Sequence, residues 1–307
     1  MDSYTEFIQR AIDGNALTSA SAAGTAINPS IWDNRLREFQ EANLVMVPLC
    51  EQFDFRGAGV DYKVTIDVAP TAASSLTETS NIGVKAFSTR NVTFTPTEYG
   101  DAYQVTQKEM NRSFFSVMER ATRKLGYSLA LAKDSLAIST ARTGATSTVL
   151  VNAKANASLL ASSDTIAYAD ITKAIRVMEG NLYVPESLII NHFQKQQLLV
   201  LPSINQAYAF GSRDALAKGL IGELFGVKIY ASTQISNDAT NTSTAIALLL
   251  GRNGAGERAL GYAVKQDPML RTFYDVLGRF TTIASHEEYD FKVLHAGAIV
   301  GLQSWSA

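Results

Sequence analysis

The alternation of apolar and polar residues is most regular in the first third of the chain. From residue 60 to residue 68 the two kinds alternate at every step, which is the period of a half-buried β-strand. A second, less strict alternation covers residues 84–95, and the small, polar residues 69–83 between them follow neither period. This pattern predicts a long β-hairpin with a soft tip. Because two strands alone cannot bury their own faces, we expect the hairpin to lie on the body of the chain or on a neighbouring molecule.

A helical period follows the predicted hairpin directly. Residues 106–109, Thr-Gln-Lys-Glu, match a capping box, in which the threonine hydroxyl and the glutamate carboxylate satisfy free backbone N–H groups. Apolar residues then recur at steps of three and four, which keeps them on one face of a helix. They are Met110, Phe114, Met118, Ala121, Leu125, Leu129, Ala132 and Leu136. Arg142 suits the negative end of the helix dipole and Gly144 is a typical stop, so we expect one helix over residues 107–141, roughly 50 Å long.

Small and polar residues dominate before the hairpin. Residues 1–29 are rich in Ala, Ser, Thr, Asn and Gly after a short helical pattern over residues 4–12, which favours an extended arm with little core of its own. An amphipathic pattern over residues 31–44 predicts a helix that ends before Pro48. We therefore expect an N-terminal arm and helix over residues 1–58.

Helical and strand patterns interleave beyond the long helix. The apolar run of residues 187–190 predicts a buried central strand. Helices are predicted over residues 170–182 and 192–201, and further strands over residues 226–231, 244–250 and 259–265. This order favours an α/β domain with its own sheet. We expect the remaining strand-rich segment to return to the sheet near the long helix, with strands at residues 270–274, 280–285, 289–294 and 298–302.

Composition narrows the classes of function. The 307 residues suffice for one large or two modest domains, and 46% apolar with 18% charged residues is typical of a globular protein. The net charge of −2 shows no excess of basic residues, which sequence-specific nucleic-acid binding would require. The single cysteine, Cys50, excludes an internal disulfide framework and is expected to be buried. Asp2 and Glu6 argue against a signal peptide, and no window approaches the ~18 apolar residues of a membrane span.

A glycine-rich segment from Gly251 to Gly256 follows a predicted strand, which is where phosphates bind in many α/β enzymes. A nucleotide-binding α/β enzyme is therefore one alternative function. However, residues 257–264 look like a second strand rather than a helix, and no Gly-Lys-Ser or Gly-Lys-Thr follows the segment. The segment is more typical of a loop between two antiparallel strands.

The remaining candidates for chemistry are isolated from one another. The three histidines, His192, His286 and His295, lack the spacing of metal ligands. Glu287 and Glu288 are most simply interpreted as solvent-exposed, and no nucleophile motif is present. The sequence therefore predicts no catalytic residues, no cofactor and no metal.

The order of these parts resembles a known family. The segments that carry the resemblance are residues 74–78 (SSLTE), 99–103 (YGDAY), 185–191 (PESLIIN), 224–229 (LFGVKI) and 298–302 (AIVGL). With the polar arm, the long hairpin and the long helix, they make nearly the whole chain resemble a tailed-bacteriophage major capsid protein of the Hong Kong 97-like fold.

The resemblance implies an α+β chain of five parts. They are an N-terminal arm and helix (residues 1–58), an extended β-hairpin or E-loop (59–105), a P-domain with a spine helix (106–163), an α/β A-domain (164–268) and a strand-rich return to the P-domain and A-domain (269–307). The chain lacks the long helical N-terminal segment that serves some members as a built-in scaffold. The resemblance therefore implies a separate scaffolding protein, or a short N-terminal arm that is processed.

The resemblance also implies a structural function and no enzymatic one. Such a protein self-assembles into hexamers and pentamers of an icosahedral head that encloses double-stranded DNA. The expected partners are copies of itself, a scaffolding protein, a portal, a decoration protein and, by non-specific proximity, the packaged DNA, without a membrane. The protein would assemble in the host cytoplasm and reside in the virion capsid. An encapsulin-type nanocompartment shell is the alternative within the same fold.

Contacts between subunits are expected along the hairpin and on the polar face of the long helix. The candidate residues are Arg56, Lys63, Leu76, Glu78, Lys85, Arg90, Glu119, Arg120, Arg123 and Lys124. The alternative for these side chains is a solvated surface whose ion pairs contribute ~0–1 kcal/mol each.

Overall fold

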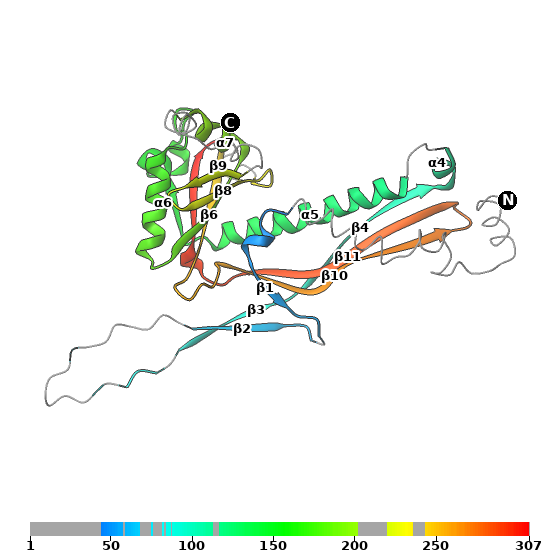
Figure 1. Cartoon of the computed structure of the whole chain (residues 1–307), viewed down its shortest axis with the longest axis horizontal. Helices are drawn as coiled ribbons and strands as arrows, with labels where there is room; N and C mark the ends of the chain where they lie inside the picture. The colour runs from blue at the N-terminus through cyan, green and yellow to red at the C-terminus, as the bar shows by residue number, and fades with distance from the viewer. Residues whose placement is uncertain are drawn as a thin grey trace. The chain divides into compact units, whose positions relative to one another are not determined.

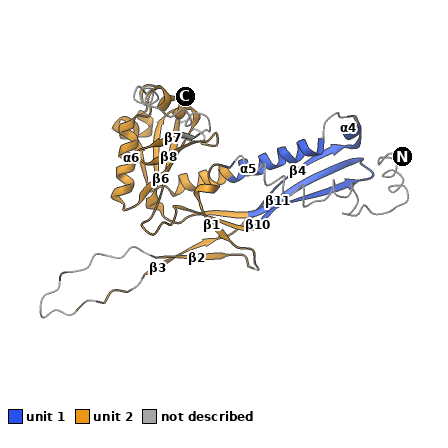
Figure 2. Ribbon diagram, viewed as in Figure 1, with its two compact units in different colours: residues 1–44, 98–133, 266–288 blue, residues 45–97, 134–265, 289–307 orange. Residues whose placement is uncertain are grey.

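The computed structural model (Figure 1) describes most of the chain from Leu44 onward. The described residues are 44–57, 59–67, 75, 82, 84–86, 88–112, 117–201, 220–235 and 243–306. The predicted N-terminal arm, most of the hairpin tip, and the candidates Leu76 and Glu78 lie outside them. Contacts divide the chain into two compact units, coloured separately in Figure 2, and each unit is described by itself.

The first unit combines helix and sheet. Among the described residues its larger segments are Glu98–Lys133 and Gln266–Glu288. Its elements are β4 (Thr97–Thr106), α4 (Gln107–Arg112), the first part of α5 (Val117–Gly144), the later part of β10 (Leu260–Asp275) and the first part of β11 (Phe280–Val293). Buried residues of the helix face buried residues of the strands, namely Val105, Ala121, Leu125, Leu129, Leu270 and Ile283. One face of the helix thus packs on one face of the sheet.

The predicted long helix is confirmed in its main part. The hydroxyl of Thr106 accepts a hydrogen bond from the backbone N–H of Glu109 at 3.3 Å, as half of a capping box should, and α5 ends at Gly144 as expected. The predicted apolar face is wrong beyond Leu129, because Ala132 is exposed and its neighbour Lys133 is buried. A face that passes through residues 125 and 129 reaches residue 133 at a period of 3.6 residues.

Two strands are longer than predicted. β10 replaces the predicted strands at residues 259–265 and 270–274, and β11 replaces those at 280–285 and 289–294. Along β11 every second residue from Ile283 to Phe291 is buried, which is the period of one continuous strand. The sequence concealed this continuity because two of the buried positions hold polar residues, Ser285 and Glu287.

The second unit contains a mixed six-stranded sheet in the order β5-β12-β9-β6-β8-β7. The strands are β5 (Ser147–Leu150), β12 (Ile299–Trp305), β9 (Thr244–Arg252), β6 (Val184–Ile190), β8 (Val227–Ala231) and β7 (Leu220–Leu224). β6 pairs with β8 in parallel and with β9 in antiparallel orientation, and its end, Leu188–Ile190, is buried as predicted. A separate sheet is present here as predicted, but two predictions of its strands are wrong. The strand predicted at residues 259–265 begins β10 of another sheet, and the strand predicted at residues 298–302 to return to the sheet near the long helix is β12 of this one.

Helices and the end of the chain complete this sheet. α6 (Tyr168–Gly180) lies beside the sheet in Figure 1 and buries Ile171, Ala174 and Met178 against it, and α7 (His192–Val200) follows β6. The last strand, β12, inserts between β5 and β9, whereas β10 and β11 belong to a separate four-stranded sheet, β1-β10-β11-β4, in which β1 is Glu51–Asp54. Short 3₁₀ turns lie at Val47–Leu49, Val151–Ala153, Ala157–Leu159 and Ala296–Ala298.

Candidate assembly surfaces

The predicted hairpin is confirmed as an antiparallel pair of β2 (Tyr62–Asp67) and β3 (Thr89–Phe94). One face of the pair is apolar and packs within the second unit. Its residues are Tyr62, Val64, Ile66, Val92 and Phe94, which form a cluster with Phe53, Ala263 and Leu294. The rings of Phe53 and Phe94 lie 5.7 Å apart and those of Phe55 and Tyr62 lie 5.0 Å apart. This burial fixes the base of the hairpin to its own subunit.

Polar contacts strengthen the same attachment. The guanidinium group of Arg90 donates a hydrogen bond to the backbone carbonyl of Leu294. The backbone N–H of Thr95 donates to the carboxylate of Asp290 at 2.9 Å, and its hydroxyl donates to Asp61 at 2.9 Å. Arg90, one of the predicted inter-subunit residues, therefore contacts its own chain.

The opposite face of the hairpin is polar. Its side chains, from the positions that alternate with the apolar ones, are Lys63, Thr65, Asp67, Thr89, Asn91 and Thr93. Thr65 and Asn91 are cross-strand partners joined by a hydrogen bond of 2.9 Å. Nearer the tip, Ile82 and Val84 are 76% and 98% exposed. The hairpin thus presents a polar face and a partly apolar arm to its surroundings.

The remaining predicted contact residues of the hairpin region are exposed. Arg56 forms an ion pair with Asp54 at 3.2 Å, with more than half of each side chain in solvent. Lys85 is exposed near the tip. These placements leave the side chains accessible from outside the subunit.

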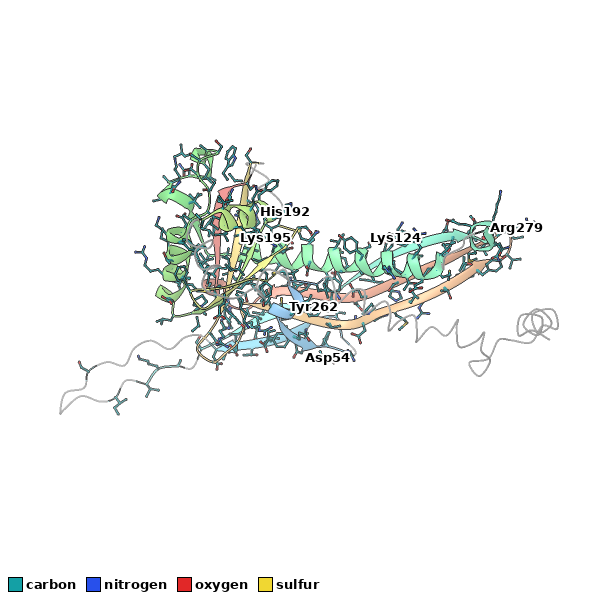
Figure 3. The ribbon with its side chains drawn as sticks, turned by 45° about the horizontal axis from the view of Figure 1, so that its top comes forward. Asp54, Lys124, His192, Lys195, Tyr262 and Arg279 are labelled. Carbon is teal, nitrogen blue, oxygen red and sulfur yellow. The ribbon has the colours of Figure 1, made fainter. Side chains whose placement is uncertain are left out.

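The predicted contact residues of the long helix lie along its outer side. Arg120, Arg123 and Lys124 are exposed, and Figure 3 labels Lys124 on α5. Glu119 is half-buried and pairs with Arg123 one turn later at 3.8 Å. The structure thus brings these two predicted residues together.

A buried ion pair escaped the sequence analysis. The ammonium group of Lys133 lies 2.7 Å from a carboxylate oxygen of Glu287, and the two side chains are only 5% and 1% exposed. The interpretation of Glu287 as a solvent-exposed acid is therefore wrong. Its place in the alternation with Ile283 and Tyr289 was the available signal, because that period turns residue 287 toward the helix.

The next residue of the helix, Asp134, is also buried and is held within the second unit. Its carboxylate accepts hydrogen bonds from the backbone N–H groups of Val45 at 2.9 Å and Met46 at 3.1 Å. Met46 is fully buried. Asp134 thereby anchors the described start of the chain to α5.

The glycine-rich segment is a closed turn between β9 and β10. The side-chain oxygen of Asn253 accepts hydrogen bonds from the backbone N–H groups of Ala255 and Glu257, both at 2.9 Å. The N–H of Gly256 bonds to the Asn253 carbonyl at 3.0 Å, so these donors are satisfied within the loop and are not directed at a phosphate. A Cβ on Gly251 would lie 2.6 Å from the backbone oxygen of Val184. The absence of a side chain at position 251 therefore allows β9 to pack closely against β6.

The three histidines have different surroundings in the described structure. His295 lies 3.1 Å from Glu257, and His286 lies 3.1 Å from the side-chain amide of Gln266. His192 is exposed at the start of α7 and is labelled in Figure 3. No group of three or more His, Cys, Asp or Glu residues suited to a metal occurs within the described ranges.

Cys50 is buried, as predicted, and its thiol donates to the Met46 carbonyl at 3.3 Å. Burial raises the pKa of the Cys50 thiol to about 12. The thiolate, which is the nucleophilic form, is therefore scarce at neutral pH.

Asp164 organises the connection between β5 and α6. Its carboxylate accepts hydrogen bonds from the side-chain amide of Asn152 at 2.7 Å and the backbone N–H of Ala161 at 2.8 Å. The ammonium group of Lys154 lies 3.4 Å away. These contacts, the Asn152 bond first, hold the pKa of Asp164 below its usual range.

Comparison with known proteins decides between the candidate functions. A family model described as phage capsid protein matches residues 90–305, which is more than half of the chain. The chain belongs to this family. Phage capsid proteins are structural, so the family supports a shell protein over an enzyme and over the encapsulin alternative. No curated protein sequence matches the chain.

Solved structures show that the fold of this phage capsid protein is the expected Hong Kong 97-like α+β fold. A structure from Mycobacterium phage Che8 is 17% identical, covers 80% of this chain and 85% of its own, and has a TM-score of 0.60. The head structure of Helicobacter pylori bacteriophage KHP40 is 11% identical, with 86% and 91% coverage and a TM-score of 0.64. A virus-like particle from Pyrococcus furiosus is 14% identical, with 89% and 98% coverage and a TM-score of 0.56.

Proposed function

We propose that this capsid protein forms hexamers and pentamers that close into an icosahedral phage head around double-stranded DNA. The family match over residues 90–305 carries the proposal. The hairpin supports it, because among the described residues its apolar face packs within the subunit while most of its polar face is exposed. Obligate interfaces commonly bury more than about 2,000 Å², and exposed arms with accessible faces are suited to supply that area.

The proposal assigns the inter-subunit contacts to two regions. The first is the E-loop hairpin over residues 59–105, with Lys63, Lys85 and the tip residues Leu76 and Glu78. The second is the exposed side of the spine helix, with Arg120, Arg123 and Lys124. Arg56 lies just before the first region, Arg90 lies within it and Glu119 lies within the second, and all three would contribute after exchange of their present partners. Each exposed ion pair contributes ~0–1 kcal/mol, so assembly depends on many such contacts acting together.

The proposal also covers the other parts and partners. The A-domain is assigned to residues 164–268, the P-domain to residues 106–163 and the strand-rich return to residues 269–307. A separate scaffolding protein, a portal and a decoration protein act on the growing or finished shell in the host cytoplasm. The net charge of −2 on the subunit suits a shell whose DNA must be released again. A basic subunit would bind the DNA phosphates, and each such contact would add salt-sensitive affinity for the DNA.

Electron microscopy of the purified protein, with light scattering on the same sample, tests the proposal. Closed particles of uniform size, or capsomer rings that close when scaffolding protein is added, are the expected result. A protein that stays monomeric at every salt and crowder concentration, with and without scaffold, would contradict it.

Deletion of residues 72–81 tests the role of the hairpin tip. The cluster around Phe94 fixes the hairpin at its base, so the deleted subunit should fold with an unchanged circular dichroism spectrum. Its shells should be absent or altered in size. Unchanged shells would show that the tip takes no part in assembly.

A further inference from the structure

A single Asn-Gly pair occurs in the sequence, Asn253-Gly254, and it lies in the turn between β9 and β10. An asparagine can lose its side-chain amide group when the next backbone nitrogen attacks its side-chain carbonyl carbon. Glycine permits this attack most readily, because it has no side chain to obstruct the approach. A Cβ at position 254 would meet nothing within 4 Å, so the space around this residue is open as well.

The turn polarises the side-chain carbonyl group of Asn253. Its oxygen accepts hydrogen bonds from the backbone N–H groups of Ala255 and Glu257, both at 2.9 Å. The bond from Ala255 closes a ring of atoms that includes the nitrogen of Gly254, and so holds the side chain beside that nitrogen. Two N–H groups on one carbonyl oxygen also stabilise the negative charge that a tetrahedral intermediate develops there.

The amide nitrogen of Asn253, which would be the leaving group, lies beside two ionisable side chains. It donates to a carboxylate oxygen of Glu257 at 2.6 Å and lies 3.4 Å from Nε2 of His295. The same carboxylate oxygen lies 3.1 Å from that Nε2. Because a carboxylate only accepts hydrogen bonds, Nε2 carries the proton of this contact. A flat amide nitrogen cannot accept that proton, whereas the pyramidal nitrogen of a tetrahedral intermediate can, so the contact with His295 improves only as the reaction proceeds.

The imidazole of His295 is fixed in this place by the second unit. Only 7% of the residue is exposed, and its ring lies 5.9 Å from the ring of Tyr183. Its backbone N–H donates to the carbonyl of Ala259, and its own carbonyl accepts the N–H of Ala298, both at 3.1 Å. More than half of the Glu257 side chain is exposed, so water reaches the turn while the imidazole stays in position.

We propose that Asn253 is a site of self-catalysed deamidation in the folded subunit. The nitrogen of Gly254 loses its proton to water and forms a bond to the side-chain carbonyl carbon of Asn253. The bond from that carbon to the amide nitrogen then breaks, and the nitrogen leaves as ammonia with the proton of His295, which water restores. Water opens the resulting succinimide ring to aspartate or isoaspartate. The net reaction consumes water and releases ammonia.

The product differs from asparagine at the contacts that hold the turn. A carboxylate at position 253 cannot donate to Glu257, and it places a second negative charge beside that side chain. Isoaspartate also lengthens the backbone of the turn by the side-chain carbon that it includes. Deamidation should therefore loosen the connection between β9 and β10 as the protein ages.

Mass spectrometry of the tryptic peptide of residues 253–258 tests the proposal, because Arg252 and Arg258 bound this peptide. The full-length protein is incubated at neutral pH, either folded or unfolded in urea, and the amide, aspartate and isoaspartate forms are quantified. The unfolded chain keeps the Asn-Gly pair but loses the contact with His295. We expect the folded protein to lose the amide at least about tenfold faster. An equal or slower loss in the folded protein would overturn the inference, whether or not the protein forms shells.

A pair of histidine variants tests the role of the acid. His295→Gln keeps a donor for Glu257 but has no proton to release, so it should lose the amide at least about tenfold more slowly than the wild type. His286→Gln is the matched control, because this half-buried histidine contacts Gln266 instead, and it should react at the wild-type rate. Circular dichroism checks that both variants fold. A wild-type rate in folded His295→Gln would overturn the proposal, and if that variant does not fold, the comparison of folded with unfolded wild type decides.

Discussion

At the scale of single residues, the most consequential feature is a pair of adjacent buried charges in α5. Lys133 forms an ion pair with Glu287, and the carboxylate of Asp134 accepts hydrogen bonds from two backbone N–H groups. An uncompensated charge in such a place costs several kcal/mol, so each of these side chains requires its partner. Both lie on the face of the helix that a purely apolar pattern would reserve for leucine or alanine. They fix which residues of α5 face inward.

Lys133→Met should destabilise the subunit by about 3–5 kcal/mol, because it removes the cation that lies 2.7 Å from the buried carboxylate of Glu287. Urea unfolding of the unassembled subunit measures the change. The double variant Lys133→Met with Glu287→Leu should recover most of the stability, since two apolar side chains of similar size need no compensation. A single variant as stable as the wild type would show that the pair is dispensable.

Asp164 should make stability depend on pH. Its pKa is lowered in the folded state, so its contribution is present above the pKa of the unfolded chain and is lost as the pH falls through the folded value. Asp164→Asn should therefore be less stable than the wild type at pH 7, and the difference should shrink toward acid pH. Urea unfolding at a series of pH values measures both curves. A difference independent of pH would contradict the assignment.

At the scale of elements, close packing between strands explains a glycine that had suggested nucleotide binding. Gly251 lies near the end of β9, opposite Pro185 of β6. A Cβ there would also lie 2.5 Å from the sulfur of Met178 on α6. Two neighbouring elements therefore need this position to have no side chain. The later glycines of the loop belong to its turn.

Gly251→Ala should destabilise the second unit by about 1–3 kcal/mol, because the added methyl group meets backbone as well as a side chain. Gly254→Ala is the control, since a Cβ at that position meets nothing within 4 Å. Thermal unfolding followed by circular dichroism compares the two variants. Equal stability of both would contradict the packing argument.

At the scale of the whole molecule, the proposed assembly uses the face of the hairpin that lies opposite its apolar cluster. This face is polar among the described residues, with Lys63, Thr65 and Asn91 exposed. Polar contacts depend on register and orientation, so they would favour one arrangement of neighbouring copies. The described residues contain no helix long and apolar enough to cross a membrane.

Assembly should raise the unfolding temperature of the protein. Anything that binds only the folded subunit stabilises it by mass action, and neighbouring copies in a shell are such ligands. Differential scanning calorimetry should therefore place the unfolding of shells at least about 5 °C above that of isolated subunits. Identical transitions at equal protein concentration would mean that the contacts between subunits contribute little.

The elements that could be predicted from the sequence are those set by local period and capping. The alternation from residue 60 produced the hairpin, the cap at Thr106 began the long helix, and the apolar run at residues 187–190 became the centre of a sheet. In the candidate surfaces, Lys63 and Lys124 were identifiable as exposed from their place opposite apolar neighbours. The exposure of Phe273 and Leu277 was not predicted, because an apolar residue near a strand pattern looks the same whether it faces a core or solvent.

By itself the sequence determined the kinds of elements, their order and the resemblance to phage capsid proteins, because these depend on neighbours along the chain. Only the tertiary structure decided that Glu287 is buried, since its partner Lys133 is far away in sequence. It also decided that β12 inserts between β5 and β9, and that Gly251 serves packing against β6. Each of these features depends on which distant segments come into contact. The sequence around a charge, a strand or a glycine does not show which distant segment it will contact.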